Sequence, residues 1–336
     1  MSGSTPPRSE AEILACLDRH FEPASERFLL GRGDDCAALK NSGGNVCVSA
    51  DMFLEDVHFR RSYFSAWEIG HKALAVNISD LAGFGAKPLA FTLCLGLPGD
   101  LGMGWLDAFF GGMAALAAKH RLSLAGGDLS RSDKLHISIS IMGENQDGCG
   151  FLGRQGAMPG DILCVVGRIG LARLGLKMLE RDGRQALGKA PCACQAHLAP
   201  EPKVEAGLAL GRAACGSRPP ALMDLSDGLA QDLPRLLGWK AGERGKLGAR
   251  LDLAPHMLHP ELLAQAAENG EDPLREAWLG GEDYALLGAC APELLAPLRA
   301  AIPELWKLGE VDGSGALSCA GLDLAGLSGF DHFSGD

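Results

Sequence analysis

The chain has 336 residues, of which 47% are hydrophobic and 22% are charged, so it is long enough for two ordinary domains and too apolar for a disordered protein. Its net charge of −11 argues against a nucleic-acid surface, because phosphate backbones are bound by clustered Lys and Arg side chains. An acidic protein that handles phosphates is expected to do so through divalent cations.

Hydrophobic periodicity predicts mixed helices and strands in the first half of the chain. The sequence LHISISIMG alternates apolar and polar residues with period two, which is typical of a strand with one wet face. In chain order, we expect a helix at 13–21, a strand at 46–50, a helix at 67–81, a strand at 89–97, a helix at 106–119, and strands at 122–125 and 135–143.

The stretch 145–160 is rich in glycine and ends in Pro159-Gly160, so it is the expected domain boundary. A second unit is expected to follow, with a strand at 162–166, a helix at 171–181, a strand at 221–223 and further helices. The sequence therefore predicts an α/β (α+β) protein with two domains, residues 1–148 and 149–336.

The 11 cysteines, an odd number, are spread from Cys16 to Cys319 without a repeated CxxC spacing. A disulfide framework is not expected at this length, and we expect reduced thiols in the cytosol instead. The N-terminus lacks the apolar segment of a signal peptide, and no apolar run approaches the roughly 20 residues that cross a bilayer. We expect a cytoplasmic protein that does not enter a membrane.

Aspartates recur directly after short predicted strands, at Asp51, Asp128 and Asp224. Open α/β sheets bind ligands at the carboxyl ends of their strands, so these side chains are candidates for a site. For each of them taken alone, the alternative is that Asp simply ends a strand or caps a helix.

Other acidic positions strengthen the first interpretation. Asp80 lies in an otherwise apolar helix, where an unpaired buried charge would be costly, and Asn77 lies three residues earlier on the same face. Asp227 follows Asp224 closely, and Glu282 is adjacent to Asp283. Carboxylates tolerate such proximity when cations neutralise them, and hard oxygen ligands favour Mg²⁺. The pattern points to polyphosphate chemistry.

Two ordinary nucleotide motifs are rejected. The sequence GRQALGKA at 183–190 is close to a P-loop, but Ala190 replaces the Ser or Thr that binds Mg²⁺, and a helix precedes it in place of a strand. Gly31 and Gly33 begin a dinucleotide fingerprint, but Cys36 occupies the third glycine position.

Two further short patterns are weighed and set aside. Arg32-Gly33-Asp34 matches an adhesion tripeptide, but nothing places the chain outside a cell. Cys192, Cys194 and His197 resemble half of a zinc site, but no second ligand pair follows.

The segments GRGDDCAAL, SADMFLEDVHF, KALAVNISDLAGFGAKP, AGGD, MDLSDGL, GGEDYALL and GFDHF resemble, in order and spacing, the motifs of the thiamine-monophosphate kinase family. The resemblance extends from Gly31 to Phe333. It implies the fold of the aminoimidazole ribonucleotide synthetase superfamily, with N-terminal domains that pair into a dimeric β-barrel and an active site in the cleft between the domains.

The implied activity is ATP- and Mg²⁺-dependent phosphorylation of thiamine monophosphate to thiamine diphosphate, in a cytoplasmic homodimer that binds neither nucleic acid nor membrane. The positions that match the family's Mg²⁺ ligands are Asp34, Ser49, Ala50 through its carbonyl, Asp51, Asp80, Asp128, Asp224 and Asp227. Those that match its ATP contacts are Gly127, Asp128, Arg154 and Ser226, with Phe110 where the family often has tyrosine. Those that match its thiamine-phosphate contacts are His58, Glu282 and Phe330.

The resemblance assigns the catalytic work to Asp51, Asp80, Asp128 and Arg154, because phosphoryl transfer depends mainly on positioning and on neutralising charge. Ala50 departs from the family's threonine, Phe330 from its tyrosine and Phe84 from its methionine. The role of Asp35 stays open.

Some alternatives also stay open. His58 could instead pack at the end of a strand, Phe330 could belong to the core, and Arg154 could pair with Asp161. Two other functions are weighed: another synthetase of the superfamily, which makes selenophosphate or activates an amide, and a nucleotide-binding regulator without turnover. Cys16 lies in a predicted helix and fits the first poorly, while the intact aspartates argue against the second.

Overall fold

The computed structural model describes residues 28–30, 34, 36–40, 45–146, 148–213, 215, 217–240, 245–327 and 329. The helix expected at 13–21 lies outside these residues.

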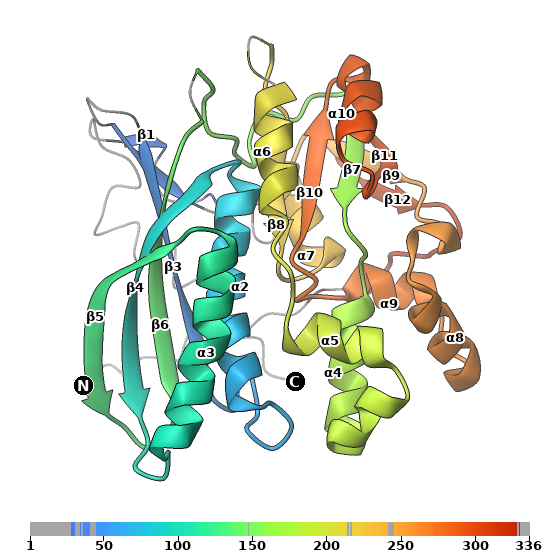
Figure 1. Ribbon diagram of the computed structural model, residues 1–336. Helices are drawn as coiled ribbons and strands as arrows, with labels where there is room; N and C mark the ends of the chain where they lie inside the picture. The colour runs from blue at the N-terminus through green and yellow to red at the C-terminus, as the bar shows by residue number, and fades with distance from the viewer. Residues whose placement is uncertain are drawn as a thin grey trace, which may run out of the picture.

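The first half of the chain forms a six-stranded sheet covered on one face by two helices (Figure 1). The sheet order is β1-β2-β3-β6-β4-β5, and all pairs are antiparallel except β4 with β5. The elements are β1 (Phe28–Leu30), β2 (Ala37–Leu39), β3 (Val46–Leu54), α2 (Ala66–Gly83), β4 (Lys87–Leu97), α3 (Met103–Lys119), β5 (Ser123–Arg131) and β6 (His136–Glu144).

The helices bury one face of this sheet because alternate residues of its strands are apolar. On β6, Ile137, Ile139 and Ile141 are buried while their neighbours are half-exposed. Helix α2 starts at a capping box, in which the Ser65 hydroxyl accepts from the Glu68 amide. It lies close to α3 because Gly70 has no side chain; a Cβ there would be 1.9 Å from the Phe109 carbonyl oxygen.

The second half forms another six-stranded sheet, in the order β12-β9-β11-β7-β10-β8, antiparallel except for β12 with β9. Its strands are β7 (Ile162–Val166), β8 (Ala221–Leu225), β9 (Gly248–Leu251), β10 (Ala285–Cys290), β11 (Leu305–Asp312) and β12 (Leu317–Cys319). Its α-helices are α4 (Leu171–Asp182), α5 (Pro191–Leu198), α6 (Val204–Ala213), α7 (Leu229–Leu236), α8 (Pro260–Asn269), α9 (Pro273–Leu279) and α10 (Leu295–Ala301). Short 3-10 helices are η1 (Gly183–Gly188), η2 (Pro255–Met257) and η3 (Pro292–Leu294).

Helix α2 joins the two halves. It contacts β3, β4 and β6 of the first sheet and also β8, β10 and α6 of the second half. Almost every residue along it is buried, which a helix packed on one side only would not show. The apolar side chains of both sheets therefore belong to one continuous core.

The predicted elements that fall on the described residues are confirmed, with shifted ends, and the mixed α/β class is correct. One inference is wrong: Asp51, Asp128 and Asp224 do not follow their strands but lie within β3, β5 and β8. Backbone pairing continues through these aspartates, since Asp51 is paired with Ile139 and Asp224 with Leu286. The P-loop-like segment forms η1 after α4, in agreement with its rejection.

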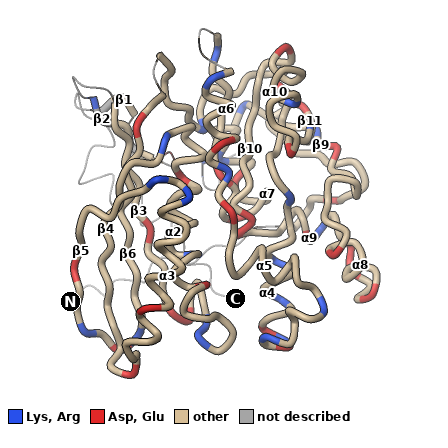
Figure 2. Tube along the Cα trace, in the orientation of Figure 1, with Lys and Arg blue, Asp and Glu red and all other residues tan. Residues whose placement is uncertain are grey.

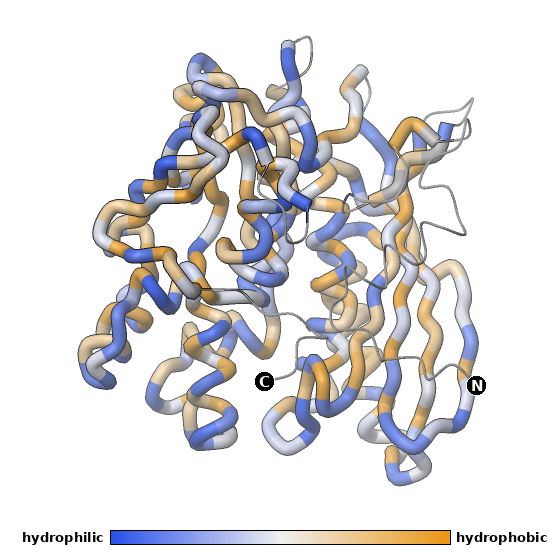
Figure 3. The backbone as a smooth tube through the Cα atoms, turned by 180° about the vertical axis from the view of Figure 1, so that it is seen from behind, coloured by the Kyte–Doolittle hydropathy of each residue, from blue (hydrophilic) through white to orange (hydrophobic). Residues whose placement is uncertain are grey.

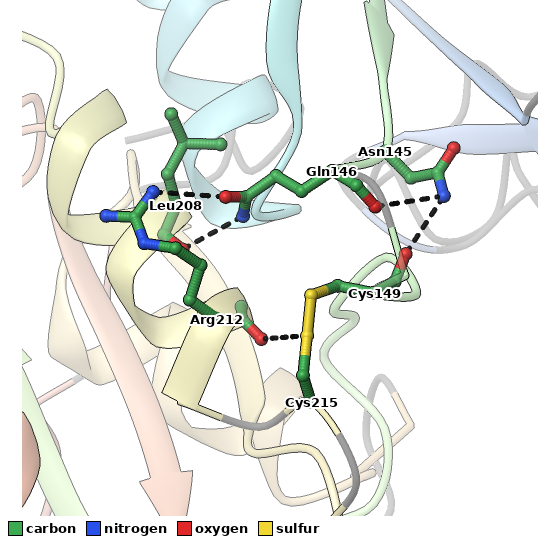
Figure 4. The surroundings of a disulfide bond; sticks show 7 residues. Asn145, Gln146, Cys149, Leu208, Arg212 and Cys215 are labelled. Atoms are coloured by element: carbon green, nitrogen blue, oxygen red, sulfur yellow. Dashed lines mark hydrogen bonds between the residues drawn. A yellow bond between two sulfur atoms is a disulfide. The ribbon is translucent and has the colours of Figure 1, made fainter.

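The expectation of reduced thiols alone is also wrong, because Cys149 and Cys215 form a disulfide (Figure 4). It ties the segment that connects the two sheets to the end of α6. Gln146 lies beside it and donates from Nε2 to the carbonyl oxygen of Leu208 at 2.9 Å. Outside this bond, Cys47, Cys94, Cys164, Cys192, Cys194, Cys290 and Cys319 are free thiols. In that same part of the chain, no helix is long and apolar enough to cross a membrane.

Candidate active site

A cavity of about 410 Å³ lies between the two halves of the molecule. Its lining combines acidic with aromatic and aliphatic residues, and Figure 2 shows Asp and Glu gathered in the middle of the molecule between the sheets. The acidic residues that line it are Asp51, Asp80, Glu180, Asp224, Asp227 and Glu282. The aromatic and aliphatic residues of the lining include Phe53, His58, Phe59, Tyr63, Leu176 and Leu279.

Strand β3 and helix α2 supply the first carboxylates. Ser49 and Asp51 alternate along β3 and therefore share the face that looks toward α2. The Ser49 hydroxyl donates to Asp80 Oδ2 at 2.5 Å, which fixes the Asp80 carboxylate next to the strand. Ala50 points to the other, exposed face of the sheet.

Strand β8 supplies the next carboxylate. Asp224 is only 4% exposed, and its Oδ2 accepts from the Ser79 hydroxyl of α2 at 2.7 Å. Ser79 of α2 thus fixes the Asp224 carboxylate, while the adjacent Asp80 is itself fixed by Ser49 of β3. A buried carboxylate at this place needs such donors, because water cannot replace them.

The turn after β8 carries Ser226 and Asp227, which both line the cavity. Arg235 of α7 donates to Asp227 Oδ2 at 2.6 Å and to Asp232 Oδ1 at 2.9 Å. Asp232 also accepts the backbone N–H of Asp227 at 3.0 Å, so this turn is fixed from within. Burial, together with the nearby Asp227, raises the pKa of Asp232 to about 7.

Tyr284 lines the cavity together with these carboxylates. Burial raises the pKa of its phenol well above the ordinary value, and the negative charges of Glu282, Asp51, Asp224 and Asp227 raise it further. No three His, Cys, Asp or Glu side chains among the described residues form a ready metal-binding cluster. The carboxylates instead line the cavity from separate elements.

Glu282 lies on a strained turn before β10. Its φ is +63°, which is rare for a residue other than glycine, and its backbone N–H donates to the Ser226 carbonyl oxygen at 2.7 Å. Its carboxylate meets Lys72 Nζ at 3.0 Å and His197 Nδ1 at 3.1 Å. Burial alone would raise the pKa of Glu282, but Lys72 and His197 outweigh it and hold the pKa far below its usual range.

His58 also lines the cavity. Its Nδ1 accepts the Leu54 backbone N–H at 3.0 Å, so the hydrogen of the neutral ring is on Nε2. Its ring stacks on Phe53 with centroids 5.8 Å apart. The packing role and a binding role are therefore both compatible with its position.

Several predicted residues lie apart from the cavity. Asp34 Oδ2 accepts the backbone N–H of Arg154 at 2.8 Å, and Arg154 Nε is 3.7 Å from Asp34 Oδ1. Asp161, the alternative partner considered for Arg154, bonds to Arg218. Asp35 and Phe330 lie outside the described residues.

The predicted ATP contacts Gly127 and Asp128 lie on the edge strand β5. Gly127 on β5 is paired with Leu93 on β4, which is paired with Ile139 on β6, and Ile139 is paired with Asp51 on β3. Gly127 and Asp51 are therefore three strands apart, a distance of roughly 14 Å. Phe110 is half-exposed on α3, edge-on to Phe109.

Lys72 and His197 are site residues that the sequence did not single out for this role. The signal for Lys72 was present, because it is a charge in the same apolar helix that drew attention to Asp80. His197 had been grouped with Cys192 and Cys194, but its side chain is directed to Glu282. Arg60 and Arg173 also line the cavity and carry no motif that would mark them.

The chain is similar to known proteins over nearly its whole length. Residues 33–144 match the family "AIR synthase related protein, N-terminal domain". The chain is 32% identical over 342 residues to thiamine-monophosphate kinase of Mycobacterium tuberculosis, across 99% of this chain and 95% of the relative. It is 38% identical over 278 residues to thiamine-monophosphate kinase of Escherichia coli K12, across 81% of each. The solved structure "AaThiL complexed with AMPPCP and TMP" is similar with a TM-score of 0.83 and 27% identity, across 99% of this chain and 100% of that chain.

Proposed function

The chain belongs to the thiamine-monophosphate kinase family and catalyses the ATP-dependent phosphorylation of thiamine monophosphate to thiamine diphosphate, and we propose that the reaction takes place in the cavity between its two sheets. The observation that carries this proposal is the convergence of Asp51, Asp80, Asp224, Asp227 and Glu282 on one cavity from separate elements.

The residues present fit Mg²⁺. The lining is rich in carboxylate oxygens, the ligands that this ion prefers. Asn77, which precedes Asp80 by three residues on α2, does not line the cavity but has a buried Oδ1 without a hydrogen-bond donor among the described residues. We assign Mg²⁺ binding to Asp34, Ser49, the Ala50 carbonyl, Asp51, Asp80, Asp128, Asp224 and Asp227. When bound, Mg²⁺ neutralises phosphate charge and orients the two phosphate groups.

The chemical difficulty of this reaction is repulsion between two polyanions. An oxygen of the thiamine phosphate attacks the γ-phosphorus, and the bond from that phosphorus to the bridging oxygen of ADP breaks. The attacking oxygen is already anionic, so no strong general base is needed. The work of the chain is to hold both phosphates in line in a space screened from water. Asp51 and Asp80, which line the cavity, are proposed as the residues closest to that transfer. Asp128 and Arg154, which lie apart from it, are proposed to contribute through the nucleotide.

The thiamine part carries a permanent positive charge on its thiazolium ring. We assign its recognition to His58, Glu282 and Phe330, of which the first two line the cavity. A carboxylate and an aromatic face are suitable partners for a cationic ring. The acceptor phosphate would then lie toward the aspartates.

ATP is assigned to Gly127, Asp128, Arg154, Ser226 and Phe110. The bound AMPPCP of the solved relative, an ATP analogue, supports a nucleotide site in this fold. Ser226 lines the cavity and Arg154 lies on the connecting segment, while the other residues are on β5 and α3.

A homodimer is part of this proposal. Helices cover one face of the first sheet, and seen from behind, hydrophobic residues recur along its strands (Figure 3). Leu124 and Leu129 on the edge strand β5 are 58% and 66% exposed, and Met52 on β3 is also exposed. An apolar surface of this kind usually marks an interface. Pairing of two such sheets into a β-barrel would bury it, with residues 1–148 as the pairing domain and 149–336 completing the site. ATP as a substrate supports action in the cytoplasm.

The test is direct. The purified protein, incubated with ATP, Mg²⁺ and thiamine monophosphate, should form thiamine diphosphate and ADP in equal amounts. Selenide, amide substrates and unphosphorylated thiamine serve as competing acceptors. ATP consumption with one of these and not with thiamine monophosphate would refute the proposal.

A further inference from the structure

The buried lysine of α2 is the starting point. Lys72 is 0% exposed, and an ammonium group in such a place must be paired because its desolvation costs several kcal/mol. Among the described residues, its carboxylate partner is Glu282, whose Oε1 is 3.0 Å from Nζ. Nζ also lies 3.4 Å from His197 Nδ1 and over the Phe64 ring, 5.5 Å from its centroid.

His197 contacts the second oxygen of the same carboxylate. Its Nδ1 is 3.1 Å from Glu282 Oε2, and because a carboxylate only accepts, the hydrogen of the ring is assigned to Nδ1. His197 is 1% exposed, and its Nε2 has no hydrogen-bond partner in the described part of the chain. Each oxygen of Glu282 is therefore bound by a different buried donor, so the carboxylate cannot rotate.

The backbone fixes Glu282 as well. The turn adopts a positive φ at both Glu282 and Tyr284, and the amide of Glu282 is bonded to Ser226. Such strain persists where the surroundings determine the conformation, and it is common at binding sites. The Glu282 side chain remains 26% exposed, on the side that faces the cavity.

We propose that Lys72 and His197 are positioning residues that hold the Glu282 carboxylate in one orientation for the thiamine monophosphate that binds above it. This inference rests on the proposed assignment of Glu282 to that substrate. Lys72 comes from α2, His197 from α5 and Glu282 from the turn before β10, so the cluster forms only when both halves of the molecule are assembled.

The test compares Lys72→Met, Glu282→Gln and the double variant with the wild type by steady-state kinetics. In Lys72→Met the carboxylate loses one of its two donors, so the KM for thiamine monophosphate should rise by about 10- to 100-fold. The KM for ATP should stay within about twofold of the wild-type value, which general damage to the fold would not produce. An unchanged KM for thiamine monophosphate overturns the inference.

The double variant separates positioning from stability. Lys72→Met leaves a buried carboxylate without its cation and could unfold the protein, whereas the double variant removes both charges at nearly constant volume and should fold. Because Lys72 acts through Glu282, the double variant should have the same KM for thiamine monophosphate as Glu282→Gln alone. A KM raised by the product of the two single effects overturns the inference.

Lys203→Met is the matched control. Lys203 is partly buried and bonded to Glu304 at 2.8 Å, away from the cavity, so its loss should leave both KM values unchanged. An inactive wild type would refute the proposed function itself. An active wild type, with kinetics that Lys72→Met does not alter, would refute the positioning role alone.

Discussion

Replacing Asp51 by asparagine tests whether the acidic residues that line the cavity bind a metal ion. The two side chains have the same shape, and Asp51 lies in the middle of β3, paired with Ile139, so the strand should remain intact. The variant loses one negative charge that faces the cavity. At a distance of about 4 Å and an effective dielectric constant of about 20, that charge contributes about 4 kcal/mol per unit of cation charge, or about 8 kcal/mol for Mg²⁺. If the transition state feels half of it, turnover falls about 10³-fold.

The assay is steady-state formation of thiamine diphosphate over a range of Mg²⁺ concentrations, with urea unfolding in parallel. The free energy of unfolding should change by no more than about 0.5 kcal/mol, as is usual for a near-isosteric change away from the core. Asp107→Asn, on the exposed side of α3, removes the same charge elsewhere and should leave turnover unchanged. If Asp51→Asn retains turnover within tenfold of the wild type at every Mg²⁺ concentration, Asp51 is not a metal ligand.

Three further outcomes follow from the structure. Replacing Cys149 and Cys215 by serine should lower the free energy of unfolding by about 4 kcal/mol, because the disulfide closes a long loop. Non-reducing peptide mapping should find the bond in the wild type. Burial raises the pKa of Asp283 to about 7, so the folded protein retains a proton that the unfolded chain releases above pH 4. Stability should therefore fall as the pH rises from 4 to 7, and Asp283→Asn should reduce this slope by up to about 1.4 kcal/mol per pH unit in urea titrations; an unaltered slope would contradict the assignment. Leu129→Lys should shift the protein from dimer to monomer in sedimentation experiments, and a wild type that sediments as a 35.1 kDa monomer at micromolar concentration would rule out the dimer.

The sequence predicted the elements of this fold well and their ends less well, for a physical reason. Apolar periodicity stops at an aspartate, whereas backbone pairing does not. Asp51 and Asp224 therefore appeared to end their strands, although each is a paired residue inside one. A strand tolerates a carboxylate in its interior where the side chain faces a cavity. Asp51 and Asp224, which ended the apolar pattern, both line the cavity.

Gly127 is a second example. The strand expected at 122–125 stops before the glycine pair that precedes Asp128, but the chain is extended there and continues β5 beside β4. A Cβ on Gly127 would lie 1.7 Å from the Leu93 carbonyl oxygen, so only glycine allows this pairing. Local sequence does not reveal that requirement, because the partner strand is far away in the chain.

The grouping of side chains was harder to predict than their identity. Asp80 was recognised because a charge in an apolar helix needs an explanation, and the same reasoning applied to Lys72. The sequence could not show which residue pairs with Lys72. Its partner Glu282 is separated from it by more than half of the chain length, and His197 comes from yet another helix. Such contacts depend on how the second half of the chain packs on α2, which periodicity does not encode.

Helix α2 has a consequence for how the molecule melts. Since one helix contributes to the cores of both sheets, neither sheet retains its packing after the other is lost. Calorimetry should therefore show a single transition, with equal van't Hoff and calorimetric enthalpies, even though the chain contains two separate sheets. A fragment that ends at residue 148 would expose the side of α2 that β8, β10 and α6 cover, and it should aggregate or remain partly folded. The two halves are separate in their backbone pairing, yet they form one cooperative unit.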